Sequence, residues 1–146
     1  MKQAAAADRK SVWPGLLVEN VAAEMEFLQS VFGARIEKSQ ENAQGTAWQI
    51  RARLGTATLL IGHAASSGTQ PCGALYVWTQ DVSGAYARAM ERGAVVISPP
   101  ASGTSGKREA GFRDPQGIIW WVGERARRPG NREVERRLAE QRSRRS

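Results

Sequence analysis

Hydrophobic and polar positions in the first half of the chain follow the order strand, helix, strand, strand, strand. Apolar and β-branched residues at 12–18 predict the first strand. Apolar residues at spacings of three and four then predict a helix with one buried face, namely Val21, Met25, Leu28 and Phe32. Gly33 is a typical helix end. Three further strands are predicted at 34–38, 46–54 and 57–62, the last two joined by a tight turn.

The second half repeats this order. A strand at 74–78 precedes a helix whose apolar positions are Val82, Ala85, Ala89 and Met90. A short strand at 95–97 and a final hairpin follow. Gly33-Ala34 and Gly93-Ala94 lie sixty positions apart, each after a strand and a helix. This weak internal repeat predicts an α+β fold of two βαβββ modules, at about 12–63 and 74–124.

The final hairpin has a well-specified turn, Asp114-Pro115-Gln116-Gly117, between predicted strands at 107–113 and 118–123. Proline fixes φ, an aspartate accepts hydrogen bonds from nearby backbone N–H groups, and glycine permits a positive φ. The turn therefore sets the register of the two strands. It also accounts for Asp114 as a turn residue rather than a catalytic acid.

Length and composition agree with one globular domain. The 146 residues are 41% hydrophobic and 24% charged, and no apolar run is long enough to span a membrane. The first eleven residues, expected to be flexible, are too weakly apolar for a secretory signal. The single cysteine, Cys72, cannot form an internal disulfide. We therefore expect a cytoplasmic protein in a reducing compartment.

The net charge of +7 is concentrated at the C-terminus. Residues 124–146 hold nine arginines and four glutamates, which gives +5 there and leaves +2 for the rest. This Arg-rich tail (125–146) is expected to be partly helical or disordered, because only Val134 and Leu138 form an apolar side. Its arginines are one route to nucleic acid or an acidic partner. The interleaved glutamates and the absence of aromatic residues favour a solvated tail instead.

Several segments together resemble a known superfamily. They are Phe32-Gly33-Ala34, Arg88-Ala89-Met90-Glu91-Arg92-Gly93-Ala94, Ser98-Pro99-Pro100 and, most specifically, Gly111-Phe112-Arg113-Asp114-Pro115-Gln116-Gly117-Ile118-Ile119-Trp120-Trp121. They are similar to the glyoxalase, bleomycin-resistance and extradiol-dioxygenase superfamily (vicinal oxygen chelate proteins), and most to its PhnB-like branch. The resemblance covers about 12–124. It implies βαβββ modules whose mixed sheet curls around a cleft, usually in a homodimer.

Metalloenzymes of this superfamily take ligands from the first, fourth, fifth and eighth strands. Alignment by Gly33, Gly93 and the hairpin turn assigns four residues to these places: Trp13, Leu60, Ala74 and Trp121. None of these side chains binds a metal, since such sites need imidazole nitrogens and carboxylate oxygens. The only histidine, His63, lies at the end of a predicted strand and is interpreted as a solvated residue. We expect no metal and no cofactor.

Alternation along the strands divides their residues between two faces. One apolar set is predicted to pack under the helices: Leu16, Val18, Trp48, Ile50, Leu59, Ile61, Leu75, Val77 and Trp120. The opposite positions would then line the cleft: Trp13, Leu17, Gln49, Arg51, Leu60, Tyr76, Trp78, Phe112 and Trp121. All of these except Leu17 are candidate ligand-binding residues.

Five aromatic residues and one arginine suit a flat, partly apolar ligand, with Arg51 or Gln49 orienting it. The predicted function is metal-free binding of a drug, toxin or metabolite, as in resistance or sequestration, with no catalytic residue. Two alternatives stay open. The rings could fill the cleft themselves or close it across a dimer interface. The protein could also be a metal-dependent lyase, isomerase or dioxygenase whose ligands this alignment misses.

Overall fold

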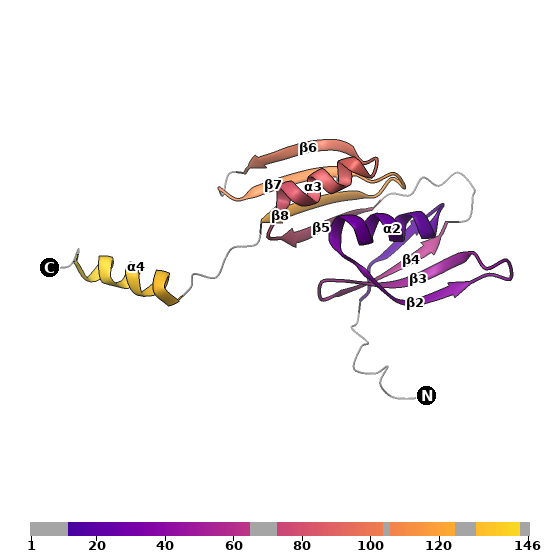
Figure 1. Cartoon of the computed structure of the whole chain (residues 1–146), viewed down its shortest axis with the longest axis horizontal. Helices are drawn as coiled ribbons and strands as arrows, with labels where there is room; N and C mark the ends of the chain where they lie inside the picture. The colour runs from indigo at the N-terminus through magenta and orange to yellow at the C-terminus, as the bar shows by residue number, and fades with distance from the viewer. Residues whose placement is uncertain (1–11, 65–72, 104–105, 125–130, 144–146) are drawn as a thin grey trace, which may run out of the picture.

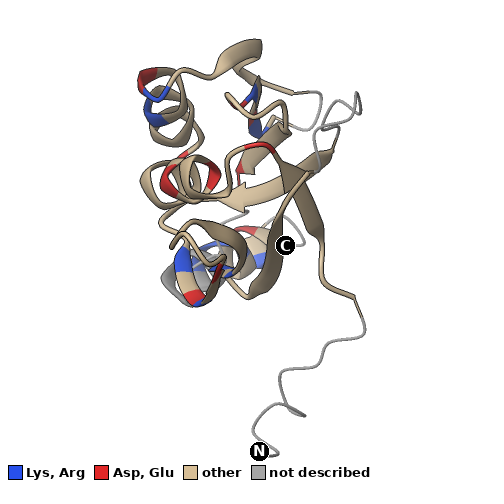
Figure 2. Ribbon diagram, turned by 90° about the vertical axis from the view of Figure 1, so that its right-hand side faces the viewer, with Lys and Arg blue, Asp and Glu red and all other residues tan. Residues whose placement is uncertain are grey.

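The computed structural model describes residues 12–64, 73–103, 106–124 and 131–143, and the side chains of 136–143 within the last segment. The expected flexible N-terminal segment and Cys72 lie outside these residues. Within them no helix is long and apolar enough to cross a membrane. Basic and acidic stretches are interspersed along the ribbon (Figure 2).

The first module contains β1 (Gly15–Val18), α2 (Val21–Phe32), β2 (Arg35–Glu41), β3 (Ala47–Leu54) and β4 (Ala57–His63). Helix α2 begins where the Asn20 side chain accepts a hydrogen bond from the Ala23 N–H group. It ends at Gly33, whose φ of 68° is in the left-handed region that glycine adopts without strain. Both helix ends therefore follow from residue types visible in the sequence.

The second module contains β5 (Ala74–Thr79), α3 (Val82–Glu91), β6 (Val95–Ser102), β7 (Arg108–Arg113) and β8 (Ile119–Glu124). The Asp81 side chain caps α3 by accepting from the Gly84 N–H group. A further helix, α4 (Asn131–Ser143), lies in the Arg-rich tail, so this part of the tail is helical. Its described side chains are all exposed.

Hydrogen bonds arrange the strands in two four-stranded mixed sheets, β1-β4-β3-β2 and β5-β8-β7-β6. In each sheet one parallel pair, β1 with β4 or β5 with β8, joins two antiparallel pairs. Helices α2 and α3 lie along the two sheets (Figure 1). The predicted α+β fold with two βαβββ modules is therefore confirmed.

One core joins the two modules. Phe32 of α2 lies 5.0 Å from the ring of Trp120 on β8, and Phe27 lies 6.2 Å from the ring of Phe112 on β7. Arg88 of α3 donates to the carbonyl oxygen of Val31 on α2 at 3.0 and 3.1 Å. Helix α2 thus packs on its own sheet and also against the second one. The buried residues of both modules form a single cluster.

The strand predictions need correction at β6 and at Trp48. Strand β6 continues beyond Ile97 through Pro99 and Pro100 to Ser102. Prolines are tolerated there because β6 is the edge of its sheet, where one side of the backbone needs no ladder partner. Trp48, predicted to pack under the helices, is 45% exposed. Alternation assigns it to the same face as buried Ile50, yet nearly half of its surface remains exposed.

Candidate functional site

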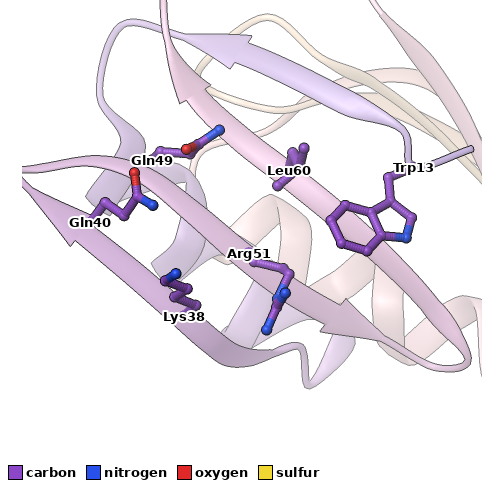
Figure 3. A pocket seen from close by; sticks show the side chains of 6 residues that line it. All are labelled: Trp13, Lys38, Gln40, Gln49, Arg51 and Leu60. Atoms are coloured by element: carbon purple, nitrogen blue, oxygen red, sulfur yellow. The ribbon is translucent and has the colours of Figure 1, made fainter. Parts of the chain in front are cut away.

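A pocket of about 270 Å³ lies on the face of the first sheet that points away from α2. Two cross-strand rows build it. In one row Lys38 of β2 lies opposite Arg51 of β3, which lies opposite Leu60 of β4. In the other, Gln40 lies opposite Gln49. Trp13, just before β1, completes the wall, and Figure 3 shows all six side chains on one side of the sheet.

Arg51 is the central cation of the pocket. Its guanidinium carbon lies 5.7 Å from the centroid of the Trp13 ring, within the range of a cation–π contact. Its Nε atom lies 3.3 Å from Glu37 Oε2, while Arg53 Nε occupies the other oxygen of Glu37 at 2.8 Å. One carboxylate is therefore shared between two arginines. Lys38 adds a further positive charge to the pocket.

One buried donor in the pocket wall, Trp13 Nε1, has no hydrogen-bond partner within the described protein. The neighbouring Arg51 Nε is also buried, and its 3.3 Å contact with Glu37 Oε2 is an ion pair without hydrogen-bond geometry. An unpaired buried donor costs free energy that a bound acceptor would recover. Together with the amides of Gln40 and Gln49, these donors favour a ligand that carries an anionic or hydrogen-bond-accepting group.

The equivalent face of the second sheet is aromatic. Tyr76 and Trp78 of β5 are 45% and 56% exposed, and their ring centroids lie 4.8 Å apart. Trp121 of β8 lies opposite Tyr76 in the register. Partial burial raises the pKa of the Tyr76 hydroxyl group, and the negative charge of Glu109 raises it further. This face offers mainly aromatic stacking surface, with the Tyr76 hydroxyl and the indole N–H groups at the edges of the rings.

Glycines make room for these rings. A Cβ atom at Gly111 would lie 2.9 Å from two atoms of the Trp121 indole, so the ring lies directly over the backbone of β7. The Tyr76 ring lies over Gly123 in the same way. Side chains that would otherwise project from the sheet can therefore lie flat along it.

One predicted cleft residue faces the other way. Phe112 is fully buried and contacts the rings of Phe27, Phe32 and Tyr86 on the helix side of its sheet. The predicted placement of Phe112 in the cleft was therefore wrong. Its ladder partner is Trp120, which lies on the same buried face.

The structure gathers half of the predicted site residues in one place. Trp13, Gln49, Arg51 and Leu60 line the pocket of the first sheet. The three rings Tyr76, Trp78 and Trp121 lie on the second sheet and are not among the residues that line that pocket. Leu17, placed on the cleft face without a binding role, is 61% exposed.

Sequence reasoning missed Lys38 and Gln40, both of which line the pocket. The predicted second strand stopped at Lys38, whereas β2 continues to Glu41. Alternation from Lys38 to Gln40 on a longer strand was the signal that could have found them. Because this edge strand is mostly polar, its sequence lacks the apolar alternation that would have indicated its length.

The superfamily's metal does not fit the residues found here. The four residues that the sequence alignment assigns to the ligand positions, Trp13, Leu60, Ala74 and Trp121, offer no suitable donor atom. The described residues contain no group of three or more His, Cys, Asp or Glu side chains that could hold a metal ion. His63 is exposed at the end of β4, as predicted.

Comparison with solved structures gives similar folds at low sequence identity. TioX from Micromonospora sp. ML1 is 23% identical, with a TM-score of 0.65, and covers 77% of this chain and 95% of its own. The PhnB protein from Bacillus cereus is 17% identical with a TM-score of 0.66, covering 80% and 100%. The fosfomycin resistance protein FosX from Listeria monocytogenes is 16% identical with a TM-score of 0.60, covering 81% and 94%.

The sequence itself matches a family model. No curated protein matches the chain. Residues 10–122 match the model of the Glyoxalase/Bleomycin resistance protein/Dioxygenase superfamily, which spans both modules and the hairpin that carries the resemblance. The chain therefore belongs to the Glyoxalase/Bleomycin resistance protein/Dioxygenase superfamily.

Proposed function

We propose that the protein binds a flat, partly apolar small molecule with an anionic or hydrogen-bond-accepting group, and that it holds this molecule without metal-dependent catalysis. The buried Trp13 Nε1 donor, which has no hydrogen-bond partner among the described residues, carries the proposal together with the adjacent Arg51 guanidinium group. The ligand class is a drug, toxin or metabolite. The aromatic residues Tyr76, Trp78 and Trp121 supply stacking surface in this scheme.

The polar end of the ligand belongs at Arg51 and Lys38. Charge-assisted hydrogen bonds from a guanidinium group are stronger than neutral ones, and a carboxylate or phosphonate accepts two at once. Glu37 satisfies Arg51 only partly, because Arg53 makes the shorter contact with that carboxylate. An incoming anion therefore does not have to displace a complete ion pair.

The test uses 2-naphthoate and its neutral analogue 2-naphthalenemethanol as probes, and tryptophan fluorescence measures their binding. We expect Arg51→Gln to weaken 2-naphthoate binding by about tenfold and to leave the neutral probe nearly unchanged. Arg35→Gln is the matched control, since it removes one positive charge from the neighbouring strand outside the pocket. Equal loss in both variants would attribute the effect to net charge and contradict the proposed site.

A second variant tests the rings. Trp121→Ala is expected to weaken both probes, because stacking does not depend on the ligand charge. Titration with zinc, nickel, manganese and iron separates the binding function from the enzyme alternative. Tight stoichiometric binding of any of them would favour a metal-dependent lyase, isomerase or dioxygenase and reject the metal-free proposal.

We also propose that the protein acts in the cytoplasm as a homodimer. Exposed tryptophan and tyrosine side chains are favoured at protein interfaces, and Tyr76 and Trp78 are both about half exposed. A partner subunit that covered these rings would bring them to a shared cleft. Sedimentation equilibrium measures the mass, and a monomer at ligand-binding concentrations would contradict this arrangement.

A further inference from the structure

The junction between the two modules contains two buried carboxyl groups. Glu24 of α2 is 0% exposed, and Asp114, in the turn between β7 and β8, is 2% exposed. They belong to different modules. A neighbouring contact crosses the same junction, where the Asn20 backbone N–H group donates to Gln116 Oε1 at 3.1 Å. The two acids are therefore part of the contact between α2 and the final hairpin.

Asp114 is almost fully engaged by donors from its own hairpin. Its Oδ1 atom accepts from the backbone N–H groups of Gln116 at 2.9 Å and Ile118 at 3.0 Å. Its Oδ2 atom accepts from Trp120 Nε1 at 2.8 Å. Hydrogen bonds donated to a carboxyl group favour its ionised form over the protonated one. The negative charge is thus held next to α2.

Glu24 has no such support. Within the described part of the chain, neither of its two buried carboxyl oxygens has a hydrogen-bond partner. No lysine or arginine forms an ion pair with it among the described residues. Burial first, and then contact with the Asp114 carboxyl group, raise the pKa of Glu24 from 4.5 to about 9. Near neutral pH Glu24 is therefore a neutral acid, whose proton separates two groups that would otherwise repel.

Other charged groups lie at the edge of this junction. A small cavity of about 190 Å³ beside Glu24 is lined by Glu26 of α2, Arg92 after α3, and Pro115 and Gln116 of the turn. Glu26 is exposed, and so is Arg92. The raised pKa of Glu24 results from burial and from contact with Asp114, and Glu26 and Arg92 are not among its causes.

We propose that Glu24 and Asp114 form a proton-dependent clamp between the two modules. With the proton present, α2 packs on the hairpin turn. Loss of the proton places two like charges in a buried site, which weakens the contact between the modules and loosens the turn.

The sign of the pH dependence follows from the raised pKa. Between about pH 4.5 and about pH 9 the folded protein holds a proton that the unfolded chain has released, so stability falls as pH rises through this window. Glutamine keeps the shape and the neutral charge of the protonated acid. We therefore expect Glu24→Gln to remove this part of the pH dependence.

Thermal unfolding of the full chain from about pH 6 to about pH 9 tests the clamp. The wild-type Tm is expected to fall by about 5 °C more than that of Glu24→Gln over this range. Glu26→Gln is the control, because it removes an exposed carboxylate two residues away on the same helix. Its Tm curve should stay parallel to that of the wild type.

Hydrogen exchange supplies a local measurement. After correction for intrinsic rates, the amides of Gln116 and Ile118 are expected to lose protection at the alkaline end in the wild type and to keep it in Glu24→Gln. Parallel Tm curves for wild type and Glu24→Gln would overturn the proposal. So would divergent Tm curves with unchanged protection of the turn, because the proton would then act elsewhere.

Discussion

The two modules share one topology but present different chemistry on the faces that point away from the helices. In the first sheet, the position next to Leu60 across the ladder is Arg51. In the second sheet, the position next to Trp121 is Gly111. A cation that projects from the first sheet is thus replaced by a glycine that lets an indole lie flat. The backbone repeat does not carry a repeated binding function.

The next row shows the same contrast. Gln49 lies opposite Gly62 in the first sheet, and Glu109 lies opposite Gly123 in the second. The first face therefore combines neutral amides with cations, while the second combines rings with a carboxylate. Two modules of one topology therefore present a face with cations and amides and a face dominated by aromatic rings.

The largest effect is expected on the helix side of the second sheet. Phe112→Ala should lower the free energy of unfolding by about 3–5 kcal/mol, because it opens a cavity between α2, α3 and β7. Chemical denaturation measures the change. The control is Trp78→Ala, whose ring is 56% exposed and should cost much less. Equal losses would contradict the division of faces.

A smaller difference in stability is expected between alanine substitutions at two glycines that occupy equivalent positions in the two sheets. Gly123→Ala places a methyl group against the Tyr76 ring, whereas Gly62→Ala meets only Leu17 Cδ2, at 3.4 Å. We expect about 1–2 kcal/mol of destabilisation for the first and less than about 0.5 kcal/mol for the second. Denaturation measures both, and near-ultraviolet circular dichroism follows the moved ring. A larger cost at Gly62 would remove the contrast.

The smallest effect on stability is expected from removal of the Arg-rich tail, which follows the second module and has no counterpart in the first. Removal of residues after Glu124 should change the free energy of unfolding by less than about 0.5 kcal/mol, since every described side chain of α4 is exposed. Binding to single-stranded DNA is the sharper measurement. Salt-sensitive affinity that disappears with the tail would establish the nucleic-acid role that its charge pattern disfavours.

The sequence predicted the modules, both helices and most strands, because the apolar periods and the glycines at helix ends are local signals. It failed at Phe112 because of one residue in the hairpin. The predicted turn of four residues, 114–117, would pair Arg113 with Ile118. In the structure the Asp114 N–H group donates to the carbonyl oxygen of Ile118, and the first pair of the strand ladder is Arg113 with Ile119. A slip of one position turns every side chain of a strand to the other face.

The pocket was half predictable for a similar reason. Arg51, Gln49 and Leu60 were found because alternation places them opposite buried neighbours. Lys38 and Gln40 lie on a charged edge strand with no buried residue to set its phase. The pairing of Glu24 with Asp114 joins residues ninety positions apart and has no local signal.

The phenylalanines of α2 determine whether the first module can be separated from the second. Phe27 and Phe32 reach across to Phe112 and Trp120, so residues 12–63 alone would expose an aromatic surface to water. We therefore expect that neither half folds alone and that unfolding is a single cooperative transition. The repeated topology should therefore behave as one cooperative unit in denaturation.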